Sequence, residues 1–270
     1  MIIDGRAISR ELVTQLAEER ARSGGTVTLA IIVATDNPVI ESFVAIKTKI
    51  ADELGVTIVR RNVEHATTES VMEAVRSFKY DDSIDGIIVQ LPMPAGVDVN
   101  AVLSEVPETK DVDGINPFTP ERKRIAHAPV VLAVMEILAR TNTPVQGSRV
   151  VVVGAGRLVG QPTAAHLRDL GAKVTMFTLD QGSIRDLLDA DIIVSGAGQP
   201  HFIKPEHVSD GVVLIDAGAS ESDDTILGDA DPACAEKARV FTPVPGGVGP
   251  ISVAMIFRNL LDLKRAASHT

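Results

Sequence analysis

Short apolar runs alternate with segments of helical periodicity along most of the chain. The strongest run is SRVVVVGAGRLVG at 148–160, where four consecutive valines lead into a glycine-rich turn. Its apolar residues do not alternate with polar ones, which is typical of a parallel strand buried on both faces. A helical pattern over 163–170 and a second strand over 173–177 follow. The pattern therefore predicts a strand-helix-strand unit around the glycine turn.

The glycine turn has the residue types of a dinucleotide-binding loop. Gly154 permits a tight turn, Gly156 lets the backbone approach a phosphate, and Gly160 allows close packing of the helix. The N–H groups of the first helical turn add an anion site. The spacing is GxGxxxG rather than GxGxxG and is a weak signal alone. Asp180, about 20 residues further on, is placed to bind a ribose hydroxyl. We expect dinucleotide binding, and the alternative is the same unit without a ligand.

The rest of the chain continues the alternation of strands and helices, which indicates an α/β fold. Further strands are predicted at 1–3, 28–34, 56–61, 86–90, 191–195 and 212–216. Helices are predicted from Ile8 to the Gly24-Gly25 pair and over 39–54, 70–78, 99–103, 130–140 and 252–263. The segment FTPVPGGVGP at 241–250 is too rich in proline and glycine for regular structure, so we expect its backbone to approach another group closely.

Composition and charge narrow the functional classes. With 270 residues, 45% of them hydrophobic, the chain can form two domains with buried cores. The net charge of −10, without a basic stripe, argues against nucleic acid and anionic membranes as partners. No leader pattern and no apolar run of roughly 18 residues is present, so we expect a cytoplasmic protein. The single cysteine allows no internal disulfide, and the histidines lack metal-ligand spacing, so no metal is expected.

Several residues outside the glycine turn are candidates for chemistry. Phe43 and Lys47 are four residues apart, which places a ring and an amine on one face of a helix. Gln90 ends a predicted strand, and ligands of open α/β sheets bind at the carboxyl ends of strands. The KDVDG turn at 110–114 carries two carboxylates, and GAGQP at 196–200, with Gly198, leaves room for a cofactor after another strand. From composition alone, the alternative is that these side chains are solvated and that the loops have no ligand.

Six motifs together resemble the methylenetetrahydrofolate dehydrogenase/cyclohydrolase family over nearly the full length. They are, in family order, NPVIESFVAIKTK, DGIIVQLPMP, KDVDGINPF, VVVVGAGRLVGQP, ADIIVSGAGQP and TPVPGGVGPISVAM. The resemblance implies two α/β domains flanking a cleft, the second a Rossmann-type parallel sheet. Residues 1–120 plus 252–270 are expected to form a folate-binding catalytic domain, and residues 121–251 an NAD(P)-binding domain.

The resemblance also implies an activity and a partner. It implies oxidation of 5,10-methylenetetrahydrofolate with NADP, or with NAD in some members, and then hydrolysis of the methenyl product to 10-formyltetrahydrofolate. It implies a homodimer that binds tetrahydrofolate derivatives.

The family's functional residues can be carried over by position. Lys47 matches the catalytic lysine, which assists water attack and proton transfer, and this requires a lowered pKa. Gln90 matches the residue that orients this lysine, and Asp113 matches the carboxylate that holds the pterin ring. The loop beside substrate and nicotinamide corresponds to Pro245, Gly246 and Gly247.

Two departures from the family concern hydrolysis and the substrate wall. The family has a tyrosine where this chain has Phe43, so stacking on folate is retained while the hydroxyl that contacts the lysine is lost. The family's proline-cysteine-threonine-proline motif has no recognisable equivalent in AHAPVVLA at 126–133.

Other departures concern the choice of dinucleotide. Ala155 stands where the family has an arginine that can favour the NADP 2′-phosphate, and Asp180 would repel that phosphate. These residues favour NAD, whereas the family default is NADP. Arg157 can replace the missing arginine, so both cofactors stay open.

Three other functions compete with the bifunctional enzyme. One is a dehydrogenase with little cyclohydrolase activity, which Phe43 and Ala155 favour. Another is a non-catalytic folate- or nucleotide-binding paralogue, which the altered motifs favour. The third is an unrelated Rossmann-type oxidoreductase, which would leave KDVDG and TPVPGGVGP unexplained.

Overall fold

The computed structural model describes residues 1–35, 37–120, 123–178, 182–222 and 225–268. The chain forms two compact units, each with its own parallel sheet. The α/β class predicted from the sequence is thereby confirmed. Unit 1 comprises Met1–Ser9 and Val130–Ser252, and unit 2 comprises Arg10–Pro129 and Val253–Thr270. The first nine residues thus lie with unit 1, whereas the division drawn from the sequence assigns them to the first domain.

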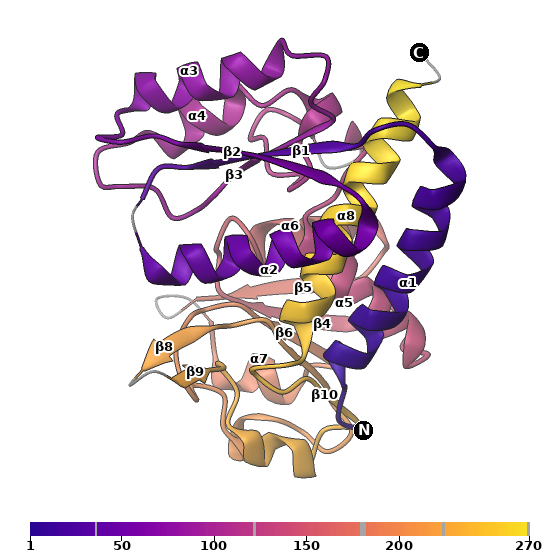
Figure 1. Ribbon diagram of the computed structural model, residues 1–270. Helices are drawn as coiled ribbons and strands as arrows, with labels where there is room; N and C mark the ends of the chain where they lie inside the picture. The colour runs from indigo at the N-terminus through magenta and orange to yellow at the C-terminus, as the bar shows by residue number, and fades with distance from the viewer. Residues whose placement is uncertain (36, 121–122, 179–181, 223–224, 269–270) are drawn as a thin grey trace. The chain divides into compact units, whose positions relative to one another are not determined.

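Unit 2 contains a three-stranded parallel sheet in the order β2-β1-β3. Helices α3 and α4 lie on one face of this sheet, and α2 lies on the other (Figure 1). The bounds are β1 Thr28–Val33, α2 Pro38–Leu54, β2 Thr57–Asn62, α3 Thr68–Lys79, β3 Gly86–Val89, α4 Val99–Ser104 and the short 3-10 helix η1 Glu108–Lys110. The central strand β1 is buried along its whole length, which explains its unbroken apolar sequence.

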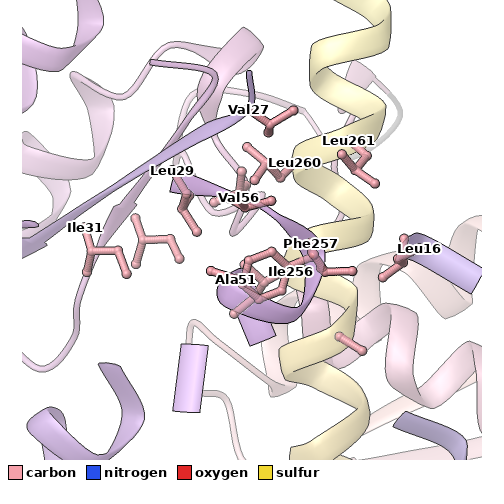
Figure 2. Packing of buried hydrophobic residues seen from close by; sticks show 14 of the residues in the cluster. Leu16, Val27, Leu29, Ile31, Ala51, Val56, Ile256, Phe257, Leu260 and Leu261 are labelled. Atoms are coloured by element: carbon pink, nitrogen blue, oxygen red, sulfur yellow. The ribbon is translucent and has the colours of Figure 1, made fainter. Parts of the chain in front are cut away.

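The core of unit 2 lies between the sheet and three helices. Figure 2 shows Leu29 and Ile31 of β1 together with Ala51 of α2 and with Phe257 and Leu260 of the final helix. That helix, α8, spans Val248–Ala267, and its residues from Val253 onward belong to unit 2. α1, Gly5–Ser23, contributes Leu16 to the same cluster. Residues distant in sequence therefore share one core, to which a buried Leu or Phe contributes about 1.5–3 kcal/mol.

Unit 1 contains a five-stranded parallel sheet in the order β10-β7-β6-β4-β5. The chain runs from β4 to β5 on one side and then crosses to β6 on the other side of β4. Ligands of such sheets bind outside the carboxyl ends of the strands at this reversal. The bounds are α5 Pro129–Arg140, β4 Arg149–Val153, α6 Gly160–Asp169, β5 Lys173–Phe177, α7 Ile184–Leu188, β6 Ile192–Ser195, η3 Pro205–His207, β7 Val213–Asp216, β8 Ser220–Ser222, β9 Thr225–Leu227, η4 Pro232–Glu236 and β10 Val240–Phe241.

Two local predictions are wrong. Met1–Ile3 is not a strand, because its only pairing is an isolated bridge from Ile2 to Phe241, a residue of the short strand β10. The segment 241–250 is not wholly irregular, because Phe241 belongs to β10 and α8 already begins at Val248. Pro250 is tolerated there because the first helical turn does not need its N–H donor.

Candidate functional site

Lys47 and Gln90 form a hydrogen-bonded pair in unit 2. Lys47 lies on α2 and only 7% of its surface is exposed, while Gln90 follows β3 directly. The Lys47 Nζ donates to Gln90 Oε1 over 2.8 Å. The Gln90 Nε2 in turn donates to the carbonyl of Leu91 over 2.8 Å, which fixes the amide so that its oxygen faces the lysine.

Asp113 interacts electrostatically with this pair. Burial lowers the pKa of Lys47, and the negative charge of Asp113 partly opposes this lowering. Burial raises the pKa of Asp113 to about 7, against the opposing influence of Lys47 and with a further increase from Asp111. The two groups thus approach one another in proton affinity, which is the property required for proton transfer near neutral pH.

The loop that carries Asp113 is held from several sides. Asp111 is buried, and its Oδ2 accepts from the backbone N–H of Asn116 over 2.8 Å. Gly114 has φ +59°, and a Cβ there would lie 2.5 Å from the carbonyl oxygen of Ala126. A side chain at this position would therefore push the loop away from the segment behind it.

Asn259 fixes the same loop and has no part in the sequence prediction. It is 2% exposed on α8, and its Nδ2 donates to the carbonyls of Val112 over 2.8 Å and His127 over 2.7 Å. The bond to Val112 holds the residue directly before Asp113. A lone amide within the apolar sequence of the final helix is the signal that could have revealed it.

Phe43 lies one helical turn before Lys47 on α2, and 44% of its surface is exposed. An exposed ring of this size is available for stacking on a planar ligand. The structure thus brings Lys47, Gln90 and Asp113 together in unit 2 and places Phe43 on the helix that carries the lysine.

The glycine turn of unit 1 is shaped by its own packing. Gly154 has φ +93°, and a Cβ there would lie 2.6 Å from the carbonyl oxygen of Gly196. A Cβ on Gly160 would lie 2.0 Å from the carbonyl oxygen of Gly154. At Gly156, by contrast, the nearest protein atom to an added Cβ is 3.9 Å away. The protein itself requires the first and third glycines, and the second leaves space for a phosphate.

The other predicted dinucleotide residues lie near this turn or outside the described part of the chain. Ala155 is exposed, and its carbonyl accepts from Gln161 Nε2 over 3.0 Å. Arg157, in the turn between Gly156 and the start of α6, is partly buried. Gly198, in the loop after β6, has φ +66°. Asp180 lies outside the described residues.

The loop Pro245–Gly247 also belongs to unit 1, where it packs against the start of α1. The backbone N–H of Gly247 donates to the carbonyl of Pro243 over 2.8 Å. A Cβ on Gly5 would lie 1.8 Å from the carbonyl oxygen of Gly247, so the two segments touch through bare backbone. Gly246 has φ +107°, which a residue with a side chain rarely adopts.

The described part of the chain has neither a metal-binding cluster nor a membrane-spanning helix. In the part of the chain that the structure describes, no group of three or more His, Cys, Asp or Glu side chains is arranged to hold a metal ion. Over the same residues, no helix is both long and apolar enough to cross a membrane.

Two family models match the chain. The catalytic domain of tetrahydrofolate dehydrogenase/cyclohydrolase matches residues 3–113, and the NAD(P)-binding domain of the same enzyme matches residues 128–268. The chain belongs to the tetrahydrofolate dehydrogenase/cyclohydrolase family. The resemblance seen in the six motifs is thereby confirmed.

Individual relatives extend this match over the full length. The chain is 37% identical to the bifunctional protein FolD of Lacticaseibacillus casei, over 98% of each chain. A crystal structure of the bifunctional enzyme FolD from Campylobacter jejuni matches with TM-score 0.92 and 29% identity, covering 100% of this chain and 99% of that one. The Trypanosoma brucei FolD, complexed with NADP and an inhibitor, matches with TM-score 0.93, 29% identity and the same coverage. Members of the family thus share both units of this fold.

Proposed function

We propose that this chain oxidises 5,10-methylenetetrahydrofolate with NAD(P) and hydrolyses the methenyl product to 10-formyltetrahydrofolate. Family membership supports the reaction class. The observation that carries the proposal is the hydrogen bond from the buried Lys47 to Gln90, together with the electrostatic interaction of Lys47 with Asp113. A solvated lysine would have neither the fixed partner nor the lowered pKa.

In the hydrolytic step, water adds to the methenyl carbon and the bond from that carbon to one ring nitrogen breaks. Lys47 in its neutral form can accept the first proton that water loses and return it to the departing nitrogen, while the second proton is released to solvent as the hydroxyl becomes the formyl carbonyl. Gln90 keeps the amine oriented because its Oε1 accepts a hydrogen bond from the Lys47 Nζ. Asp113, when ionised, can accept hydrogen bonds from the paired N–H donors of the pterin ring.

In the oxidative step, the bound dinucleotide supplies the hydride acceptor. Residues of unit 1 fit such a group, because Gly156 leaves open space beside the backbone of the turn that follows the carboxyl end of β4. Gly198 and the loop Pro245–Gly247 are proposed to lie beside it. In this assignment unit 2 binds folate and unit 1 binds the dinucleotide.

The choice between the two dinucleotides is part of the proposal. Ala155 lacks the cation that would pair with a 2′-phosphate, and Asp180 follows the second strand of the unit in sequence. Both favour NAD, whereas the relative from Trypanosoma brucei is complexed with NADP. We propose that NAD is accepted, and that Arg157 decides whether NADP is accepted as well.

The decisive experiment is an assay of the purified protein. It follows reduced nicotinamide from 5,10-methylenetetrahydrofolate with NADP and NAD in parallel and records whether methenyl product accumulates. Turnover without accumulation is the expected result. Folded protein that binds folate but turns over with neither dinucleotide would instead be a non-catalytic paralogue.

A dehydrogenase with little cyclohydrolase activity is the second candidate, and Phe43 favours it. A phenylalanine has no hydroxyl to hold the lysine, so hydrolysis can lag behind oxidation. Accumulation of the methenyl product in the same assay would identify this candidate.

A homodimer and a cytoplasmic location are further proposals that follow from the family. The oligomeric state is checked by light scattering on the purified protein. A monomer at micromolar concentration would contradict the first of them.

A further inference from the structure

Two buried carboxylates in unit 1 have no role in the function proposed above. Asp216 ends β7 and is 1% exposed, and Asp229 follows β9 and is 0% exposed. Burying a carboxylate is costly unless hydrogen-bond donors surround it. The hydrogen-bond donors around each carboxylate therefore indicate which segments it holds in place.

Asp229 holds the loop that carries Gly198. Its Oδ2 accepts from Ser195 Oγ over 2.6 Å and from the backbone N–H of Ala197 over 2.7 Å. Its Oδ1 accepts from the backbone N–H of Gln199 over 2.7 Å. The three donors lie before and after Gly198, so one carboxylate fixes both arms of this loop.

Asp216 holds the segment around Asp229. Its Oδ2 accepts from the backbone N–H of Ala230 over 2.8 Å, and its Oδ1 accepts from that of Gly218 over 2.9 Å. A Cβ on Gly218 would lie 2.2 Å from Asp229 Cγ, and one on Gly228 would lie 2.2 Å from Asp216 Oδ2. Each carboxylate thus packs directly against the backbone of the other's turn.

The loop held by Asp229 in turn supports the glycine turn. A Cβ on Gly154 would lie 2.6 Å from the carbonyl oxygen of Gly196 and 2.9 Å from Ala197 Cα. A Cβ on Gly196 would lie 2.3 Å from Val159 Cγ1, at the N-cap of α6. Any shift of the loop would therefore be transmitted to the backbone that is expected to face the phosphates.

We propose that Asp229 is a positioning residue for dinucleotide binding, which shapes the loop 196–199 and, through it, the glycine turn. The side chain is fully buried, so it acts through the backbone and not by touching the ligand. This inference rests on the proposed use of a dinucleotide. Asp216 acts one step further away by holding the segment at Ala230.

The test is the variant Asp229→Asn, compared with wild type in two measurements. An asparagine amide must turn an N–H group toward at least one of the three donors, so the loop loses an anchor at nearly unchanged volume. We expect the Kd for NAD or NADP, whichever wild type binds more tightly, to rise by roughly tenfold. The rate of methenyltetrahydrofolate hydrolysis, which requires no dinucleotide, stays within about twofold.

Two further variants make the result interpretable. Asp231→Asn removes the same charge two residues away while keeping an N-cap for η4, and it should leave both measurements unchanged. Ser195→Ala removes one donor to Asp229 and should raise the dinucleotide Kd by about threefold with hydrolysis retained. Ser195→Ala decides the question if Asp229→Asn fails to fold.

Three results would overturn the inference. An unchanged dinucleotide Kd in Asp229→Asn, or in Ser195→Ala if only that variant folds, would show that the loop needs no anchor. An equal loss of hydrolysis and of dinucleotide affinity would show a merely structural role. Wild-type protein that binds neither NAD nor NADP would remove the proposed function itself, and the inference with it.

Discussion

The two candidate sites of this protein differ in which atoms form them: side chains in unit 2 and backbone in unit 1. In unit 2 the chemistry lies in side chains, because Lys47 is hydrogen-bonded to Gln90 and both Lys47 and Asp113 have shifted pKa values. In unit 1 the open surface at Gly156 consists of backbone, and the carboxylate of Asp229 is buried beneath the neighbouring loop. The first kind of site depends on protonation, and the second depends on shape.

This difference predicts how each site fails. Removing a functional group in unit 2 should reduce a rate and leave the fold unchanged. Adding a methyl group in unit 1, or removing an anchor beneath its surface, should reduce the affinity for the dinucleotide.

Lys47→Met should lower the rate of methenyltetrahydrofolate hydrolysis by at least about a hundredfold, because general acid–base groups contribute about that much or more. The Kd for the dinucleotide should be unchanged. Stopped-flow loss of methenyl absorbance and fluorescence titration with the reduced dinucleotide measure the two quantities. Lys49→Met is the matched control, since Lys49 is exposed on the same helix, and a comparable loss there would rule out a special role for Lys47.

Gly156→Ala should raise the dinucleotide Kd by roughly tenfold with a melting temperature close to that of wild type. The added Cβ meets no protein atom within 3.9 Å but occupies the space through which a phosphate approaches. Gly160→Ala should lower both affinity and melting temperature, because its Cβ would lie 2.0 Å from the Gly154 carbonyl oxygen. Equal melting temperatures and equal affinities in the two variants would contradict the distinction between them.

The KM for the folate substrate should fall by about tenfold as the pH rises from about 6 to about 8. The pKa of Asp113 is raised to about 7, so this side chain is mostly protonated at about pH 6 and mostly ionised at about pH 8. In the proposed mode of binding, only the ionised form can accept hydrogen bonds from both N–H donors of the pterin ring. The midpoint of this change in KM reflects the titration of the interacting Asp113–Lys47 pair rather than of Asp113 alone. Asp113→Asn should show a high KM without this slope, and the same slope in that variant would assign it to another group.

Phe43→Tyr should raise the rate of hydrolysis by about threefold and leave dehydrogenation nearly unchanged. Residues 43 and 47 are one helical turn apart on α2, so the added hydroxyl can contact the lysine. Rates measured on each substrate separately provide the comparison. A variant with no gain would show that the hydroxyl does not limit hydrolysis.

Much of the fold could be predicted from local pattern. β5 begins and ends where the sequence indicates, at Lys173 and Phe177, and α2 starts one residue earlier than predicted. Apolar runs and glycine turns are local features, so they specify strands and loops before any tertiary contact forms. The contacts that correct the prediction are distant in sequence, such as those that pair Ile2 with Phe241.

The residues of the candidate sites likewise fall into those that a local motif indicates and those that only distant contacts reveal. Family motifs identified Lys47, Gln90 and Asp113, which lie within recognisable stretches of sequence. Asn259 and Asp229 were missed because their partners, Val112 and Ala197, lie far away along the chain. An isolated buried amide or carboxylate has no local pattern, and only the folded chain shows which loop it holds.

The most direct test of this account measures hydrolysis and dinucleotide affinity side by side in Lys47→Met and Asp229→Asn. In Lys47→Met, hydrolysis should be lost and dinucleotide affinity retained. In Asp229→Asn, dinucleotide affinity should be reduced and hydrolysis retained. Loss of both properties in the same proportion in each variant would contradict the separation of a side-chain site from a backbone site.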